Sequence, residues 1–142
     1  MLRVTCDTNA LLRMAHAGPQ SELYSAWRTG QLILVLSLAI YNELADVLSR
    51  PKTWRYVDQE RGAAFLNLLR QRAEFVTPTS DTPPCRDPDD ATVIGTALAG
   101  QVPYLVSSDK DLYEDTVLVE VLSQRGVQVI GVSQMMAQMR RK

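Results

Sequence analysis

Short apolar runs alternate with longer amphipathic segments along this chain. The runs fall at residues 2–6, 32–36, 74–76, 104–106 and 127–130, the third being the weakest. Continuous apolar runs of this length are typical of strands that are buried on both faces of a sheet. The segments between them are long enough for crossover helices, which favours parallel strand pairing. The pattern predicts an α/β fold: a three-layer α/β/α arrangement around a central, mostly parallel sheet of four to five strands.

Two of the predicted helices have recognisable ends. Ser37 stands in the N-cap position before a helix expected over residues 38–50, and Pro51 stops that helix. Ser133 is expected to cap the last helix, which finishes in the cations of residues 140–142.

Length and composition indicate one globular domain over residues 1–142. The chain is 46% hydrophobic and 22% charged, which is ordinary for a protein with a buried core. The stretch at 77–84, rich in Pro, Thr and Ser, is expected to be a loop rather than a linker. A net charge of −1 argues against a surface that binds nucleic acid everywhere. It leaves room for a local basic patch beside a local acidic one.

The two cysteines, Cys6 and Cys85, are too few for a disulfide framework, and we interpret both as small buried hydrophobes. The first residues lack the long apolar segment of a secretory leader. No stretch reaches the roughly 18–20 apolar residues that a membrane span needs. We therefore expect a cytoplasmic protein with no membrane partner.

Several acids occupy positions that the local pattern does not require. Asp7 directly follows the first apolar run, and Asp109 follows the fourth. Because ligands in parallel α/β sheets bind beyond the carboxyl ends of the strands, these two acids share one edge. In the helix after the second run, Glu43 stands at the border of the apolar stripe, whereas Asp46 points further toward solvent. Glu43 is therefore the acid expected to face inward.

Asp90 heads another apolar stripe. It lies three and four residues before Val93 and Ile94, on the face of the helix that is expected to meet the core. Each acid alone has an ordinary interpretation: Asp7 as a turn or capping residue, Glu43 as a surface acid, and Asp90 as a cap. Asp87 and Asp89 also crowd this helix start, and we interpret both as acids that the helix dipole favours there. The joint pattern of four acids projected to one edge favours a site.

A cluster of Asp7, Glu43, Asp90 and Asp109 would repel itself unless a cation neutralised it. Oxygen ligands without His or Cys select Mg²⁺ or Mn²⁺ over zinc. The single histidine, His16, cannot build a zinc site and is interpreted as a surface or packing residue.

These motifs resemble the PIN domain family over nearly the whole chain. The resemblance rests on four segments: Cys6-Asp7-Thr8-Asn9, Asn42-Glu43-Leu44, Asp87-Pro88-Asp89-Asp90 and Ser107-Ser108-Asp109-Lys110-Asp111. It points to a bacterial subgroup described as toxins of toxin–antitoxin pairs, related to VapC-type toxins. Many relatives have Thr before the final acid pair, where this chain has Ser107 and Ser108.

The resemblance implies a metal-dependent endoribonuclease with RNA as substrate. Its four acids fall on Asp7, Glu43, Asp90 and Asp109, with Asp111 as an additional metal ligand. It further implies an antitoxin partner that blocks the site, and a homodimer.

Other polar residues are candidates for supporting roles. Thr8, Asn9 and Ser108 are expected to fix the acids or to reach a phosphate, and Lys110 and Arg13 are further phosphate contacts. Arg50, Lys52 and Arg55, interleaved with Trp54 and Tyr56, suggest an RNA-binding segment. The alternative for this segment is a solvated helix face with core aromatics.

Three other functions remain open from the sequence. A haloacid-dehalogenase-like phosphatase also has an Asp after its first strand, but it needs a second acid two residues on, where this chain has Asn9. A response-regulator receiver needs a phosphoacceptor at the third strand end, where Thr77 and Pro78 stand. A PIN-like module that binds RNA or protein without cleavage is the third.

Overall fold

Five parallel strands form the centre of the protein, seen in a computed structural model that describes residues 2–85 and 87–140, without the side chain of Asp111. The order across the sheet is β3-β2-β1-β4-β5, and every neighbouring pair is parallel. The strands are β1 (Leu2–Cys6), β2 (Leu32–Leu36), β3 (Glu74–Phe75), β4 (Tyr104–Val106) and β5 (Gln128–Ile130). The predicted fold class is confirmed, and each apolar run is a strand or contains one.

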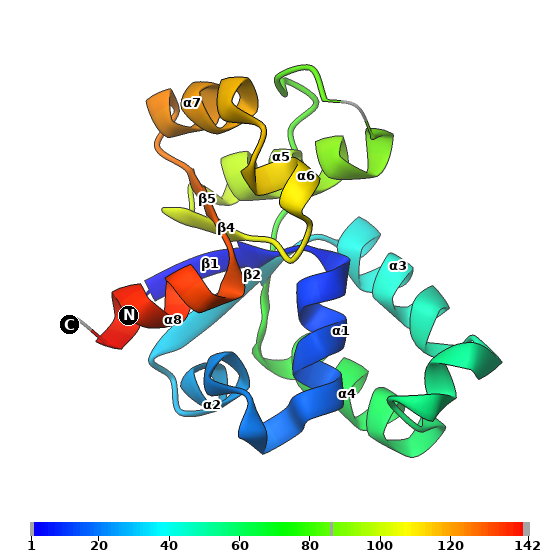
Figure 1. Cartoon of the computed structure of the whole chain (residues 1–142). Coiled ribbons are helices and arrows are strands. Elements are labelled where there is room, and N and C mark those ends of the chain that lie inside the picture. Colours follow the sequence, from blue (N-terminus) through cyan, green and yellow to red (C-terminus); the bar gives the residue numbers. More distant parts are fainter. Residues whose placement is uncertain (1, 86, 141–142) are drawn as a thin grey trace.

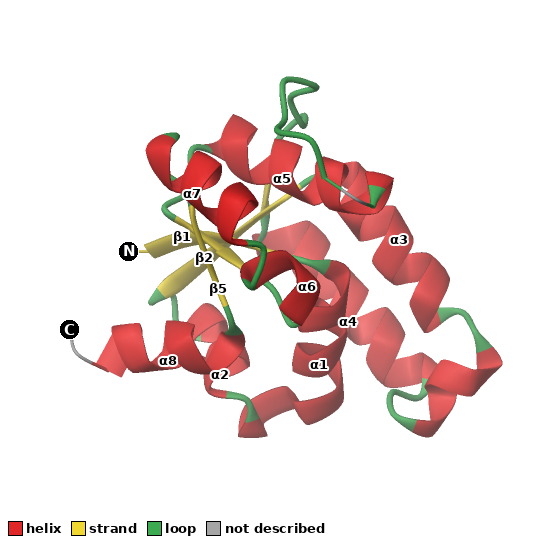
Figure 2. Cartoon of the chain, turned by 45° about the horizontal axis from the view of Figure 1, so that its top comes forward, coloured by secondary structure: helices red, strands yellow, loops and turns green. Residues whose placement is uncertain are grey.

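Helices cover both faces of this sheet (Figures 1 and 2). On one face α5 packs over β1, β2 and β4, and α7 packs against β5. On the other face lie α1, α2 and α8, with α2 in contact with β2 and α8. The α-helices are α1 (Thr8–Ala17), α2 (Glu22–Arg28), α3 (Leu38–Leu48), α4 (Gln59–Arg72), α5 (Pro88–Gly100), α6 (Lys110–Tyr113), α7 (Thr116–Gln124) and α8 (Val132–Arg140), with short 3-10 turns η1 (Gly18–Gln20) and η2 (Pro51–Arg55).

Most helices begin where a side chain can accept their free N–H groups. Ser37 caps α3 as predicted, its hydroxyl accepting from the Ile40 N–H, although this helix ends at Leu48, two residues before the predicted end. The predicted cap at Ser133 is wrong, because α8 already begins at Val132 and Ser133 lies inside its first turn. The residue before α8 is Gly131, which has no side chain to act as a cap.

The predicted loop at residues 77–84 is confirmed, and it packs closely on α5. The Thr79 N–H donates to the Gly95 carbonyl at 3.1 Å. A side chain at Gly95 would bring its Cβ within 2.4 Å of the Thr79 carbonyl oxygen, so only glycine permits this approach. Within the described residues, no helix has the length and apolar character that a bilayer crossing demands.

Candidate active site

Strands β1 and β4 end side by side and place Asp7 against Ser107. Cys6 pairs with Val106 in the parallel register, and the Asp7 N–H donates to the Val106 carbonyl at 3.1 Å. The Ser107 hydroxyl donates to Asp7 Oδ2 at 2.5 Å, while Asp7 Oδ1 accepts the Ala10 N–H at 2.8 Å and caps α1. Asp7 is therefore both a helix cap and a strand-end acid, and both of its carboxylate oxygens are held in place.

The Asp7 carboxylate lies in a poorly solvated position, with only 8% of the residue exposed. Burial raises its pKa, and the negative charge of Asp109 raises it further. Hydrogen bonds from the Ser107 hydroxyl and from the Ala10 and Ser108 N–H groups work in the opposite direction without cancelling the effect of burial. The charged form of Asp7 is thus disfavoured and would gain from a nearby cation.

Asp90 and Asp109 share this electrostatic environment. Asp109 follows β4, and its N–H donates to the Ser107 hydroxyl oxygen at 2.9 Å. Asp90 lies in the first turn of α5, whose N-cap is Asp87. Burial, followed by the negative charges of Asp87, Asp109 and Asp7, raises the pKa of Asp90 to about 6. Asp7, Asp90 and Asp109 therefore come from three separate elements and lie close enough to repel one another.

A small acidic pocket opens beside these residues. It has a volume of about 110 Å³, and its lining includes four acids, Asp87, Asp90, Asp109 and Asp115, as well as Cys85.

The interpretation of Asp87 and Asp89 as residues of a helix start is confirmed, because Asp87 Oδ1 accepts the Asp89 N–H at 3.0 Å.

The two cysteines differ in their surroundings. Cys6 is fully buried, as predicted. Cys85 is only half-buried, so its interpretation as a buried hydrophobe is wrong. Burial and the charges of Asp90 and Asp87 raise the pKa of the Cys85 thiol, which keeps it protonated.

Glu43 is not among the acids whose charges raise the pKa of Asp7 and Asp90. The predicted stripe of α3 is buried at Ile40, Leu44 and Leu48, but its border position leaves Glu43 exposed, and the prediction that its side chain faces inward is wrong. Asp46 is also exposed and pairs with Arg50. Asp111 lies in α6, but its side chain is outside the described part of the structure.

The predicted supporting residues have different environments. Thr8 is 7% exposed, and its hydroxyl is buried with no hydrogen-bond partner among the described residues. Asn9 and Lys110 are exposed, and Ser108 is half-buried. Sequence reasoning gave no role to Ser107, whose hydroxyl links Asp7 to Asp109. Its position directly after an apolar run that pairs with β1 was the available signal.

Comparison with known families accounts for this arrangement. The sequence model of the PIN domain matches residues 3–111. The chain belongs to the PIN domain family. The match includes the segments that carry Asp7, Glu43, Asp90 and Asp109. No curated protein matches the chain by sequence.

Solved structures support the same fold. This PIN domain is similar to a chain in the crystal structure of VapBC2 from Rickettsia felis bound to a DNA fragment from their promoter. The TM-score is 0.62 at 12% sequence identity, and the alignment covers 92% of this chain and 98% of the other. At this identity the likeness concerns the fold.

The donor chemistry of the PIN domain site fits a hard divalent cation. Asp7, Asp90 and Asp109 offer only oxygen ligands, and the unpartnered Thr8 hydroxyl lies next to Asp7 in the chain. In the described part of the chain, no three potential ligands converge tightly enough to hold an ion as they stand.

The predicted RNA-binding segment lies apart from these acids. Arg50 is paired with Asp46 at 2.7 Å, and Lys52 and Arg55 are exposed in η2. Trp54 is 36% exposed and Tyr56 60% exposed, so these aromatics are not core residues. The core-aromatic alternative is wrong for them, and RNA binding by this segment stays a prediction.

Proposed function

We propose that this PIN domain is a metal-dependent endoribonuclease that cleaves RNA phosphodiester bonds with Mg²⁺ or Mn²⁺. The observation that carries the proposal is the group of mutually repelling carboxylates, Asp7, Asp90 and Asp109, at the carboxyl edge of the parallel sheet. Repulsion among these carboxylates destabilises the folded protein, and a bound cation would relieve it.

We assign a role to each acid from its surroundings. Asp7, held through both oxygens, and Asp109, fixed through its N–H to Ser107, are assigned to hold the cation. A cation held there would supply positive charge at the scissile phosphate and would make water a better nucleophile. Asp90, whose pKa is about 6, is assigned to orient the attacking water and to accept its proton. Glu43 and Asp111 are assigned to complete the ligand set.

We further propose that the protein is the toxin of a toxin–antitoxin pair acting in the cytoplasm. Support comes from the family resemblance of its motifs and from the fold it shares with a chain of the VapBC2 structure. In this proposal an antitoxin covers the carboxylate edge, and the protein forms a homodimer.

Cleavage assays on the full chain test the nuclease proposal. A 5′-labelled RNA is incubated with the protein in Mn²⁺ or Mg²⁺ and then in excess EDTA. Cleavage is expected only with metal, and Asp7→Asn is expected to abolish it. Asp58→Asn is the matched control, because Asp58 also caps a helix, with Oδ1 accepting the Arg61 N–H at 2.8 Å, but lies at the start of α4.

Two results would contradict the proposal. Cleavage that persists in EDTA or in Asp7→Asn would point to a contaminating nuclease or to a metal-free mechanism. RNA binding without cleavage in either metal would instead favour a non-catalytic PIN module.

A further inference from the structure

A second pocket adjoins the carboxylates on the other side of Ser107. It has a volume of about 250 Å³ and brings together the start of α8, the loop after β4, and residues of α1 and α6. Its polar lining includes Arg13, Ser107, Ser108, Lys110, Ser133 and Gln134. The Ser107 side chain lines this pocket and also contacts Asp7, so the pocket lies next to the proposed catalytic carboxylates.

The charge of this pocket is opposite to that of the acidic pocket. Arg13 and Lys110 are both exposed, and in the described part of the chain neither has an ion-pair partner. Of the other described arginines, four form ion pairs, namely Arg3 with Glu74, Arg50 with Asp46, Arg125 with Asp81 and Arg140 with Glu22, and five do not. None of the described side chains that line the pocket is acidic. Two cations without an ion-pair partner among the described residues thus line a concave surface next to the acids.

Backbone and hydroxyl donors reinforce the preference for an anion. The Gly131 carbonyl accepts the Met135 N–H at 3.0 Å, which makes Gly131 the N-cap of α8. Gly131 has no side chain to accept the first N–H groups of this helix, and the helix dipole places partial positive charge at that end. Ser108 and Ser133 add hydroxyl donors from two different elements.

We propose that this pocket, formed by Arg13, Lys110, Ser133 and the start of α8, binds a phosphodiester group of the RNA strand next to the one cleaved at the carboxylates. The inference rests on the proposed nuclease function. Cations and N–H donors hold a phosphate that needs no metal, while the carboxylates hold the metal for the reacting phosphate. Ser107 separates the two subsites, so one strand reaches both.

Binding measured without cleavage tests this assignment. Fluorescence anisotropy with a labelled 12-nucleotide single-stranded RNA is recorded in EDTA over a series of KCl concentrations. Replacing both cations (Arg13→Gln with Lys110→Gln) is expected to raise Kd about tenfold at low salt. It should also reduce the slope of log K against log salt by about 1.4, since each phosphate contact contributes about 0.7 on a single strand.

A second variant keeps the fold intact while adding a negative charge. In Gly131→Asp the new Cβ meets the Tyr113 ring at 3.8 Å and the Ser107 carbonyl oxygen at 4.0 Å, which are ordinary contacts. Aspartate is a favoured N-cap, so the melting temperature should stay equal or rise. Kd for RNA is nevertheless expected to rise about tenfold, because the carboxylate repels phosphate.

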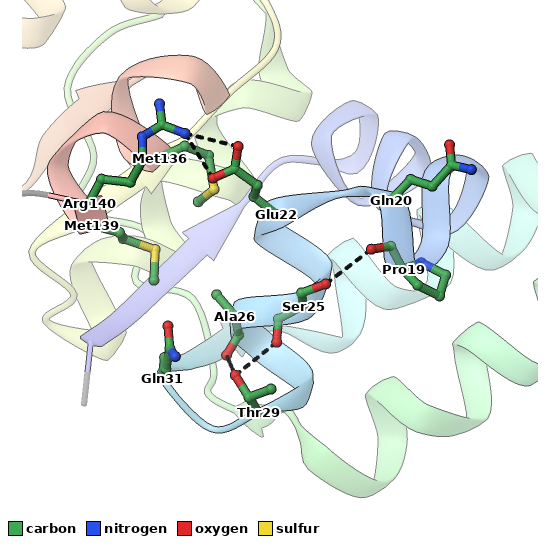
Figure 3. Close-up of a pocket in the computed structure, with 10 residues that line it drawn as sticks. All are labelled: Pro19, Gln20, Glu22, Ser25, Ala26, Thr29, Gln31, Met136, Met139 and Arg140. Atoms are coloured by element: carbon green, nitrogen blue, oxygen red, sulfur yellow. Dashed lines mark hydrogen bonds and ion pairs between the residues drawn. The ribbon is translucent and has the colours of Figure 1, made fainter.

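The matched control is Arg140→Gln at the other end of α8. Arg140 contacts both carboxylate oxygens of Glu22 at 2.9 Å (Figure 3), so its charge is already compensated. Kd should stay within about twofold of wild type. Unchanged Kd and salt slope in the double variant, or unchanged Kd in Gly131→Asp, would overturn the inference. A polyglutamate peptide that binds as tightly as RNA with the same dependence on Arg13 and Lys110 would also overturn it.

Failure of this inference can be told apart from failure of the nuclease proposal. If wild type binds RNA in EDTA through Arg13 and Lys110 but does not cleave with Mn²⁺, the nuclease proposal fails and the subsite stands. If wild type cleaves with Mn²⁺ and the double variant keeps its KM, the nuclease proposal stands and the subsite fails. A raised KM with kcat little changed supports both.

Discussion

Two pockets of this PIN domain differ in the charged residues that line them. The acidic pocket beside Asp90 holds about 110 Å³ and gathers four aspartates: two from the start of α5, one from the segment after β4 and one that caps α7. The pocket between α2 and α8 holds about 350 Å³, and its two charged residues, Glu22 and Arg140, form an ion pair across it (Figure 3). The charges lining the larger pocket thus balance, whereas the charged residues described in the lining of the smaller one are all acidic.

We infer the functional region from this difference in charge and not from pocket size. In the pocket between α2 and α8, Met136 and Met139 supply apolar surface, and nothing in the charge pattern calls for a ligand. In the acidic pocket, burial and like charges raise the pKa of Asp90 to about 6. The fold therefore places the Asp90 carboxylate where its charged form is unfavourable. Such destabilising arrangements are typical of functional sites.

The largest expected effect is a loss of RNA cleavage on substitution in the acidic pocket but not in the pocket between α2 and α8. Asp109→Asn removes one negative charge and one proposed metal ligand while keeping the shape of the side chain. Its kcat/KM for RNA cleavage with Mn²⁺ is expected to fall on the order of 100-fold or more, as for loss of a metal ligand or its close support. Glu22→Gln, tested in the same assay, should stay within about twofold. Equal losses in both variants would break the comparison.

Ser107 should give the next largest effect, as a positioning residue. Ser107→Ala removes the hydroxyl that donates to Asp7 and accepts from the Asp109 N–H. Mn²⁺ affinity and kcat/KM are expected to fall about 10- to 100-fold together, since partners that orient metal ligands have effects of this size. Ser107→Thr keeps the hydroxyl and should restore most of both. A stability loss in Ser107→Ala with unchanged Mn²⁺ affinity would leave Ser107 with a structural role only.

The sequence predicted the sheet better than the side-chain geometry of the site. Buried parallel strands such as β2 are continuous apolar runs and can be read directly from the chain. The role of Ser107 depends on strand register, which places the hydroxyl of Ser107 rather than that of Ser108 against the Asp7 carboxylate. Glu43 sits at the border of its apolar stripe, where helical periodicity cannot decide between core and solvent, and it is exposed.

A smaller effect concerns the pH dependence of folding. The folded-state pKa of Asp90 lies above the unfolded value, so the folded protein binds this proton more tightly. Stability of the metal-free protein should therefore rise as pH falls from about 7 toward 5, and fall as pH rises through 6. Thermal melting in EDTA checks this, and Asp90→Asn should flatten the dependence. A pH profile equally steep in Asp90→Asn would assign it to other groups.

The smallest expected effect lies in the pocket between α2 and α8. The Glu22–Arg140 pair is solvent-exposed, with side chains 59% and 62% exposed. Glu22→Gln should therefore change the free energy of unfolding by less than about 1 kcal/mol, and less still at high salt. Urea denaturation measures this difference. A loss of several kcal/mol would mean that this pair holds α8 in place.

Calorimetric titration of the metal-free protein with Mn²⁺ near pH 7.5 tests the central claim most directly. Wild type and Glu22→Gln are expected to bind Mn²⁺ with the same affinity. Asp7→Asn and Asp109→Asn are expected to bind at least about tenfold more weakly, because each removes a carboxylate from the proposed ligand set. If wild type bound no Mn²⁺, or if both aspartate variants bound it as tightly as wild type, the carboxylate edge would not be a metal site.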